Sequence, residues 1–242
     1  MVRFAVVFGI LGVVLAALAC RLAREAVGAW WLVALIEAYL AACLLLLALA
    51  YGLRHGGLPV EDVLGHPAWS PLLRVLLMPY LALGATTLYL SRRVGSEDLM
   101  SPVASGLFIG RLPFPSERRL LERAGITAVL NLCWEFPRLS GAEELPGVAV
   151  ARVPVLDGCP PTHRQFREAV ARVAAWRAEG RVVLIHCAQG HGRSATVAAA
   201  VLARLGLASG PDDALGTILA SRPRATPSGG QRAAFARFLA AP

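Results

Sequence analysis

The amino-acid sequence predicts an α/β domain preceded by three transmembrane helices, and three observations support this architecture. Of the 242 residues, 56% are hydrophobic and only 17% are charged, whereas an average soluble domain carries about 25% charged residues. The apolar excess is concentrated in three long runs within residues 1–95. From residue 101 onward, short apolar strands alternate with helices, which is the pattern of an α/β layered domain.

Each of the three apolar runs is close to the roughly 20 residues that a helix needs to cross a bilayer. The runs cover residues 4–20, 28–53 and 72–90. Amphipathic helices that pack on the core of a soluble protein would show a polar face, which these runs lack. Arg74, near the start of the third run, is expected to extend to the membrane interface, and the role of Glu37 in the second run is left open. We therefore predict a membrane anchor over residues 1–95.

The first run permits a second interpretation. Residues 1–19 resemble a secretory signal that ends in an A-x-A cleavage site, and Cys20 directly after that site is a feature of lipoprotein signals. Because two further runs follow, we favour an uncleaved first helix. Four arginines lie on one side of the predicted membrane and three on the other, which predicts an external N-terminus and cytoplasmic residues 91–242. The chain is thus expected to be a multi-pass protein of the inner or cell membrane.

The charge distribution bears on the partners of the protein. The formal net charge of +8 divides into +3 for residues 1–95 and +5 for residues 96–242, with Gly95 and Ser96 as the expected linker. This division indicates no single basic patch, and no nucleic-acid partner is expected. The sequence leaves the oligomeric state open.

The elements of the second domain are predicted from apolar runs and helix caps. Strands are expected at 106–110, 126–132, 148–153 and 181–186, and helices at 116–123, 162–179, 192–205, 211–221 and 228–240. Ser116 and Thr162 are the expected caps of the first two helices, and Thr162 forms a capping box with Gln165. Strand 181–186 has an unbroken apolar centre, as in a parallel sheet that is buried on both faces.

One segment between a predicted strand and a predicted helix carries the candidate chemistry. It reads His186-Cys187-Ala188-Gln189-Gly190-His191-Gly192-Arg193-Ser194. A cysteine six residues before an arginine is a weak motif on its own. Here a histidine precedes the cysteine, glycines occupy the third and fifth positions after it, and a serine follows the arginine. That combination is specific, and we call residues 187–193 the signature loop.

The predicted loop suits the binding of a phosphate and nucleophilic attack on it. Its backbone N–H groups meet a helix N-terminus, where the helix dipole favours an anion and the thiolate form of Cys187. Gly190 and Gly192 allow the chain to bend around an oxyanion, and Arg193 offers a planar fork for two phosphate oxygens. Attack by Cys187 on phosphorus would form a phosphocysteine.

Further roles are expected for three neighbouring groups. Ser194 would donate a hydrogen bond to the sulfur as it leaves, and His186 would fix the loop. The loop residues that would bind substrate are Ala188, Gln189, Gly190, His191, Gly192 and Arg193. Asp157, which lies 30 residues before Cys187 on a loop with glycine and prolines, is the candidate general acid; the alternative is an ordinary turn aspartate.

Residues 98–242 resemble the cysteine-dependent dual-specificity protein phosphatases. The His-Cys-x5-Arg-Ser motif is complete, and residues 153–158 are similar to the acid loop of that family. The resemblance implies a protein tyrosine phosphatase-like fold, with a four- or five-stranded, mostly parallel sheet between helices. It also implies phosphomonoester hydrolysis without a metal or other cofactor. Cys187 would be the nucleophile, Arg193 the phosphate binder and Asp157 the acid.

The sequence leaves the substrate open between two classes. The short domain has no room for a long recognition loop, so a shallow pocket would admit phosphoserine, phosphothreonine or lipid headgroups. Phosphoproteins with phosphorylated Tyr, Ser or Thr are the first class. Residues 131–135 resemble a segment of tensin-type lipid phosphatases, which makes phosphatidylglycerophosphate or a phosphoinositide the alternative. Gln189 and His191 stand where those lipid enzymes carry Lys or Arg. His191 would either bind a second phosphate or form only the rim of the loop.

Three other functions compete with the enzyme interpretation. They are a catalytically silent phosphate-binding module, a sulfurtransferase and a membrane scaffold with a vestigial domain. The presence of Cys187, Arg193 and Asp157 together favours the phosphatase. No structural disulfide is expected, because a thiolate enzyme needs a reducing compartment. Cys133 is the candidate that would form a reversible disulfide with Cys187 under oxidation, ahead of Cys159.

Overall fold

The computed structural model describes residues 2–25, 27–65, 70–95, 97–136, 142 and 145–241, and it divides the chain into two compact units, Met1–Arg93 and Val94–Pro242. Ser96 of the expected linker and Met1 of the possible signal lie outside the described residues.

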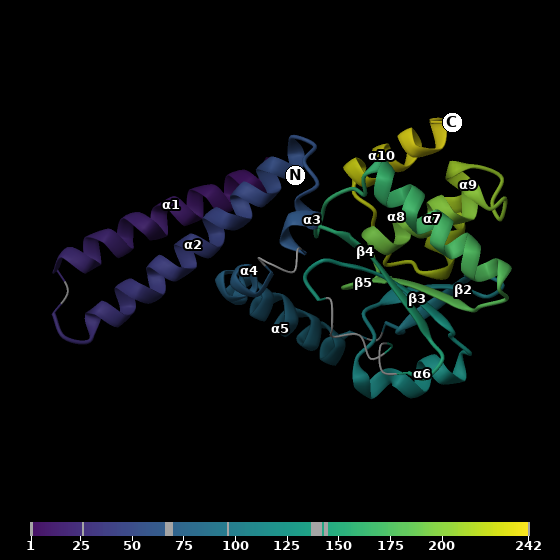
Figure 1. Cartoon of the computed structure of the whole chain (residues 1–242), viewed down its shortest axis with the longest axis horizontal. Coiled ribbons are helices and arrows are strands. Elements are labelled where there is room, and N and C mark those ends of the chain that lie inside the picture. Colours follow the sequence, from purple (N-terminus) through teal and green to yellow (C-terminus); the bar gives the residue numbers. More distant parts are fainter. Residues whose placement is uncertain are drawn as a thin grey trace. The chain divides into compact units, whose positions relative to one another are not determined.

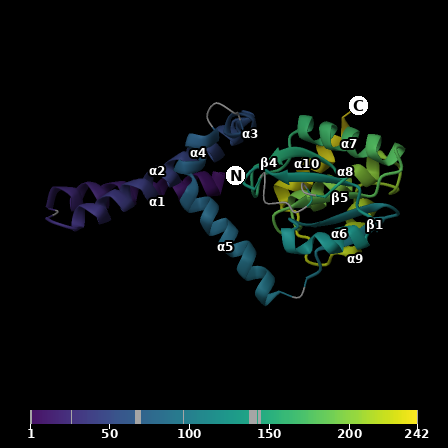
Figure 2. The ribbon, with the colours of Figure 1, turned by 60° about the horizontal axis from the view of Figure 1, so that its bottom comes forward.

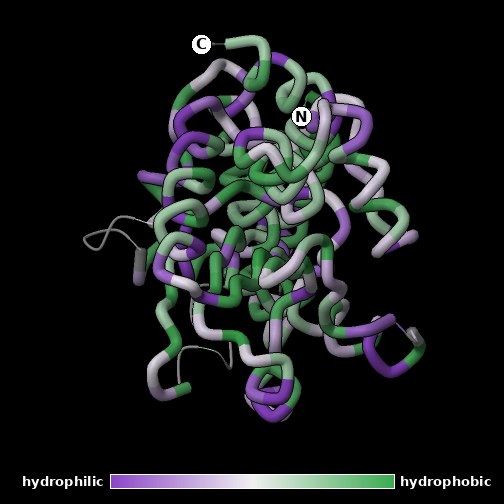
Figure 3. The backbone as a smooth tube through the Cα atoms, turned by 90° about the vertical axis from the view of Figure 1, so that its right-hand side faces the viewer, coloured by the Kyte–Doolittle hydropathy of each residue, from purple (hydrophilic) through white to green (hydrophobic). Residues whose placement is uncertain are grey.

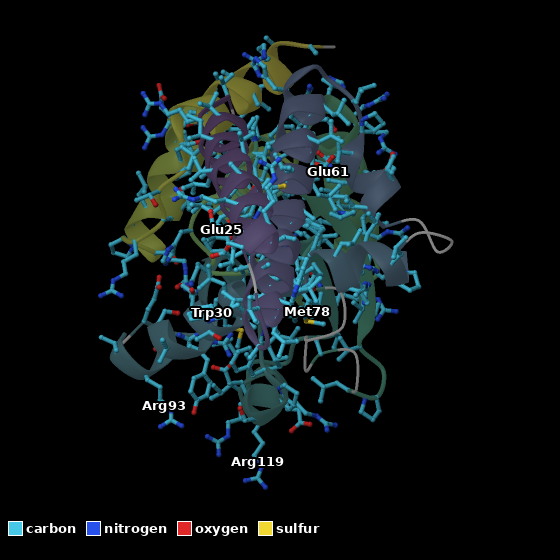
Figure 4. All side chains as sticks on the ribbon, turned by 90° about the vertical axis from the view of Figure 1, so that its left-hand side faces the viewer. Glu25, Trp30, Glu61, Met78, Arg93 and Arg119 are labelled. Atoms are coloured by element: carbon cyan, nitrogen blue, oxygen red, sulfur yellow. The ribbon has the colours of Figure 1, made fainter. Side chains whose placement is uncertain are left out.

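Two long helices form most of the N-terminal unit. Helices α1 (Val2–Glu25) and α2 (Trp30–His55) lie side by side and run antiparallel (Figure 1), and Glu25 and Trp30, which flank the turn between them, are labelled in Figure 4. A Cβ on Gly12 would lie 2.8 Å from the Leu45 side chain, so this small residue permits close helix packing. Near the open end of the hairpin, the rings of Phe4 and Tyr51 are 5.3 Å apart.

The predicted third span is wrong as a single helix. After the short α3 (Val60–Leu64), the chain forms α4 (Ser70–Leu76) and then α5 (Met78–Val94), which has 17 residues. The interruption has a physical cause in Pro79, which has no N–H to donate to the carbonyl four residues earlier. That carbonyl, on Val75, instead accepts a hydrogen bond from the Tyr39 hydroxyl of α2. Among the described residues, two helices rather than three are long and apolar enough to cross a membrane.

A buried ion pair closes the end of α2. Arg54 Nε lies 2.8 Å from Glu61 Oε1 of α3, and the two side chains are 5% and 1% exposed. Figure 4 labels Glu61 beside this end of the helix. The Arg54 charge is therefore compensated inside the unit and contributes little to the charge of its surface.

The second unit is built on one five-stranded sheet, which confirms the predicted α/β class. Its strand order is β1-β2-β5-β3-β4, and every neighbouring pair is parallel except β1 and β2. The strands are β1 (Met100–Ala104), β2 (Leu107–Arg111), β3 (Ala128–Cys133), β4 (Ala149–Val155) and β5 (Val183–Cys187). The sequence did not predict β1, because this edge strand buries only Val103 and contains Pro102, a residue that edge strands tolerate.

Helices cover both faces of the sheet, as the views in Figures 1 and 2 show. They are α6 (Arg118–Arg123), α7 (His163–Ala178), α8 (Arg193–Arg204), α9 (Pro211–Ser221) and α10 (Gly229–Ala240). The predicted capping box is present at α7, where Thr162 Oγ1 accepts the Gln165 N–H at 3.1 Å. The predicted cap at Ser116 is wrong, because a 3₁₀ turn over Pro115–Glu117 precedes α6.

The hydrophobic core places β5 and α8 at the centre of the unit. All five residues of β5 are buried, and so are the first ten residues of α8. On the α6 face, Leu121 packs in one buried cluster with Val129 and Leu184. The hydropathy colouring in Figure 3 shows hydrophobic strand segments inside and hydrophilic stretches along outer turns. The loop that joins β5 to α8 is thus held by two buried elements.

Candidate active site

The signature loop runs from the last residue of β5, Cys187, to the first residue of α8, Arg193. The carbonyl of Ala188 accepts the Leu112 N–H at 3.1 Å, and that of His191 accepts the Thr226 N–H at 3.0 Å. In a trans peptide the carbonyl and the next N–H point in opposite directions. Carbonyls held from outside therefore turn the following N–H groups inward, which forms a concave anion site.

Gly190 is the position where the loop requires glycine. Its φ is +79°, a conformation that other residues rarely adopt. A Cβ there would also lie 2.6 Å from the carbonyl carbon of Gly110. Gly192, by contrast, has a φ of −101° at the cap of α8. Of the two predicted bending glycines, Gly190 alone has a left-handed backbone.

The candidate nucleophile lies inside this site. Cys187 is 3% exposed, and its Sγ accepts the Gly190 N–H at 3.3 Å. The Ser194 hydroxyl is 3.5 Å from the same sulfur. The structure thus brings together Cys187, the predicted nucleophile, and Ser194, which the sequence predicts to support the leaving sulfur.

Arg193 is held in place by two carboxylates. Its guanidinium is bidentate to Glu135, at 2.9 Å and 2.6 Å, and donates to the Val155 carbonyl at 2.9 Å. Asp157 Oδ1 lies 2.8 Å from the same group. Burial opposes the charge of Arg193, but Glu135 and Asp157 outweigh it and raise its pKa well above the ordinary value. Arg193 is thus charged and fixed in orientation.

Glu135 is the functional residue that sequence reasoning missed. It lies two residues beyond β3, in a turn shaped by Asn131, whose side-chain oxygen accepts the Cys133 N–H at 2.8 Å. The Asn131 amide also donates to the Phe136 carbonyl at 3.4 Å. A carboxylate just past the carboxyl end of a central parallel strand was the available signal, since these strand ends share one edge of the sheet.

Asp157, the candidate acid, follows β4 and reaches the same edge of the sheet. Its side chain is 56% exposed, while its contact with Arg193 brings it to the signature loop. The next residue, Gly158, has a φ of +67°, so the chain turns sharply directly after the acid. The structure therefore brings Cys187, Arg193 and Asp157 to one site, although 30 residues separate the acid from the cysteine in sequence.

The remaining predicted residues surround the loop. His186 is fully buried, with Nδ1 3.4 Å from the Cys187 carbonyl oxygen. Ala188 is buried, whereas Gln189, His191 and Gly192 are partly exposed. His191 Nε2 lies 2.7 Å from Glu97 Oε2, a partner that the sequence did not suggest.

Cys133, the candidate redox partner, ends β3. It is fully buried, and desolvation raises its pKa well above the ordinary value of a thiol, with further contributions from Glu135 and from Cys187. Cys133 is therefore a neutral thiol near the site.

Within the described part of the chain, no group of three or more His, Cys, Asp or Glu side chains could hold a metal ion.

A cysteine and an arginine at the two ends of one anion-binding loop, with an acid at its rim, define the class of cysteine-dependent phosphatases. The family model "Swiss Army Knife protein, DSP-PTPase phosphatase domain" matches residues 113–239. The chain belongs to this dual-specificity phosphatase family, which confirms the resemblance in the sequence.

Individual relatives agree with this assignment. Mouse dual specificity phosphatase 28 is 35% identical over 118 residues, 46% of this chain and 69% of the relative. Bovine dual specificity protein phosphatase 14 is 31% identical over 119 residues, so the match spans only 58% of that relative. Among solved structures, PTPMT1 in complex with PI(5)P has a TM-score of 0.53 and 25% identity, covering 58% of this chain and 94% of that one.

Proposed function

We propose that this protein is a membrane-anchored phosphomonoester hydrolase that works through a phosphocysteine. The contact of the Cys187 sulfur with an inward N–H of a loop that ends in a fixed arginine carries the proposal. Membership of the dual-specificity phosphatase family supports it. A module that only binds phosphate would not need a candidate general acid beside Arg193. The contact of Asp157 with the Arg193 guanidinium is therefore the second observation that supports the proposal.

The reaction follows from these positions. The Cys187 thiolate attacks phosphorus, the bond from phosphorus to the substrate oxygen breaks, and Asp157 gives its proton to that oxygen. Water then attacks the phosphorus of the phosphocysteine and loses a proton to Asp157. The phosphorus–sulfur bond breaks, so inorganic phosphate and the Cys187 thiolate are released. Ser194 donates a hydrogen bond to the departing sulfur. Arg193 and the loop N–H groups stabilise the charge on the phosphoryl oxygens in both steps.

The proposed substrates are phosphoproteins with phosphorylated Tyr, Ser or Thr. The family is the observation that favours them, since the matched relatives include dual specificity protein phosphatases 14 and 12. A lipid phosphomonoester, such as phosphatidylglycerophosphate or a phosphoinositide, is the second candidate. It is favoured by the likeness to PTPMT1, whose structure holds PI(5)P, and by the proposed membrane anchor, which concentrates the site near lipid headgroups.

The anchor itself is proposed from exposed apolar surface. Only 11% of an apolar 18-residue stretch of α1, and 22% of the corresponding stretch of α2, is buried inside the protein. A soluble monomer rarely exposes apolar patches this large, and the hydrocarbon of a bilayer would cover them. Two crossings return the chain to its starting side, so we place the N-terminus with the catalytic unit, in the reducing cytoplasm that a thiolate requires. This replaces the external N-terminus predicted from three spans.

The test of the activity uses the full chain in detergent with p-nitrophenyl phosphate. Cys187→Ser should abolish turnover, and Asp157→Ala should slow it about 100-fold. Acid quenching during turnover of a labelled substrate should trap phosphate on the wild-type protein and none on Cys187→Ser. Turnover that persists in Cys187→Ser would overturn the proposal. A panel of phosphopeptides beside phosphatidylglycerophosphate and phosphoinositides then decides between the two substrate classes.

The test of the anchor uses fusions of a reporter that is active only outside the cytoplasm. A fusion after residue 242 should be inactive, and a fusion after Arg24, in the last turn of α1, should be active. Activity of the first fusion would place the catalytic unit on the outside and contradict the proposed orientation.

A further inference from the structure

An arginine outside the predicted site supports the signature loop from behind. Arg222, which directly follows α9, is 1% exposed. Its Nε donates to the Gly190 carbonyl at 3.0 Å, and its second terminal nitrogen donates to the Gln189 carbonyl at 3.4 Å. These carbonyls lie between the two that backbone N–H groups hold. Arg222 thereby turns the N–H groups of Gly190 and His191 toward the anion site.

The first of these two N–H groups, that of Gly190, has an acceptor inside the anion site. The Gly190 N–H, which belongs to the peptide whose carbonyl Arg222 holds, donates to the Cys187 sulfur. Rotation of that peptide would remove a donor from the thiolate and from a bound phosphate. The geometry of the anion site therefore depends on the position of the Arg222 guanidinium.

The segment around Glu97 in turn holds Arg222. Glu97 Oε1 lies 3.1 Å from the guanidinium, an ion pair rather than an aligned hydrogen bond. The Asp98 carbonyl and the Ser101 hydroxyl accept from the same side chain, at 3.2 Å and 3.4 Å. Burial lowers the pKa of Arg222, and the charge of Glu97 opposes this effect.

The same Glu97 carboxylate also contacts the loop. Its other oxygen, Oε2, is 2.7 Å from His191 Nε2. One carboxylate therefore bridges a loop side chain and the arginine behind the loop. Glu97 lies close to the boundary of the two units at residues 93 and 94 and before the family match, which begins at residue 113.

We propose that Glu97 is a positioning residue of the signature loop. Through Arg222 and His191 it fixes the orientation of the loop peptides and hence the affinity of the loop for a phosphoryl group. The inference rests on the proposed function only in that the loop binds phosphate. It means that the functional catalytic unit includes the segment next to the N-terminal unit.

A second effect of the carboxylate would act in the opposite direction. A negative charge near an anion site repels phosphate, so its removal would strengthen binding if repulsion were its main effect. If positioning is the main effect, removal weakens binding. The two explanations also differ for conservative variants, since Glu97→Gln keeps the length and one acceptor oxygen without the charge, and Glu97→Asp keeps the charge without the reach.

The experiment measures tungstate binding by calorimetry with the full chain in detergent, in the Cys187→Ser background. This readout needs no turnover. We expect Glu97→Ala and Glu97→Asp to bind about 10-fold more weakly, as for loss of one charge-assisted hydrogen bond, and Glu97→Gln to stay within about 3-fold. The control is Glu179→Ala, which removes a partly exposed carboxylate 2.6 Å from Arg181 and should leave binding unchanged.

The outcomes separate this inference from the proposed function. Equal or tighter binding by Glu97→Asp, together with tighter binding by Glu97→Gln, would overturn the inference and assign repulsion to Glu97. Because Glu97 is 17% exposed and lines a cavity of about 270 Å³, these polar replacements are accommodated without a clash. If the tungstate pattern holds but Cys187 gives no hydrolysis, the inference stands and the enzyme proposal fails. No tungstate binding in the Cys187→Ser parent would overturn the inference, and the enzyme proposal would then be decided by Cys187-dependent turnover alone.

Discussion

Replacement of Glu135 by glutamine tests whether a buried carboxylate holds the phosphate-binding arginine. Arg193 and Glu135 are 2% and 5% exposed, so the change leaves a buried guanidinium with one neutral acceptor in place of two charged oxygens. Breaking a buried pair on one side costs about 3–5 kcal/mol. Asp157 compensates only in part, because its carboxylate is 56% exposed and screened by water. We therefore expect a loss of about 3 kcal/mol in unfolding free energy.

The assay combines thermal unfolding with steady-state kinetics of the full chain. A loss of about 3 kcal/mol corresponds to a decrease of roughly 6–12 °C in the melting temperature of a domain of this size. A misplaced guanidinium should also lower kcat/KM by about 100-fold. Glu179→Gln, which breaks a pair that is 54% and 33% exposed, should cost less than about 1 kcal/mol. Equal effects of the two substitutions would refute the reasoning about burial.

Three further expectations concern the loop and the buried thiol. Peroxide should convert Cys187 to a sulfenic acid, and attack by the Cys133 thiol should then form a disulfide with loss of water. After peroxide treatment, Cys133→Ser should therefore recover less activity than wild type when a thiol reductant is added. The pKa of Cys133 is raised in the folded protein, so its thiol ionises first in the unfolded chain, and the unfolding free energy should fall above pH 9. The fall should be steeper than in Cys133→Ser by up to about 1.4 kcal/mol per pH unit. Urea unfolding at several pH values measures this difference. Gly190→Ala should abolish oxyanion binding in calorimetry, since the new Cβ would meet Gly110 at 2.6 Å; tungstate affinity like that of the parent would contradict this.

The sequence predicted the parts of the fold that local signals specify. The Thr162 capping box, the buried strand before Cys187 and the helix after Arg193 depend on neighbouring residues, and each is present in the structure. Edge strand β1 escaped prediction because it has little buried surface of its own. The third span was overestimated because hydropathy alone does not register the hydrogen bond that Pro79 fails to make.

The candidate site shows the same division. Residues within one motif, such as Cys187 and Ser194, were found together because their spacing is fixed along the chain. Glu135 and Arg222 were missed because they reach the loop from 58 and 32 residues away in sequence. Such partners are specified by the order of strands in the sheet and by side chains that cross between elements, and no local pattern encodes either.

The outward hydrogen bonds of the signature loop have a consequence for the energetics of binding. A flexible loop loses conformational entropy when it closes on a ligand, and this loss subtracts from affinity. Here the Leu112 and Thr226 N–H groups and the Arg222 guanidinium, which all belong to the chain itself, hold the loop carbonyls in the folded protein. The ordering is therefore completed when the chain folds. A phosphoryl group meets donors that already have their final directions, so more of its interaction energy remains for stabilising the transition state.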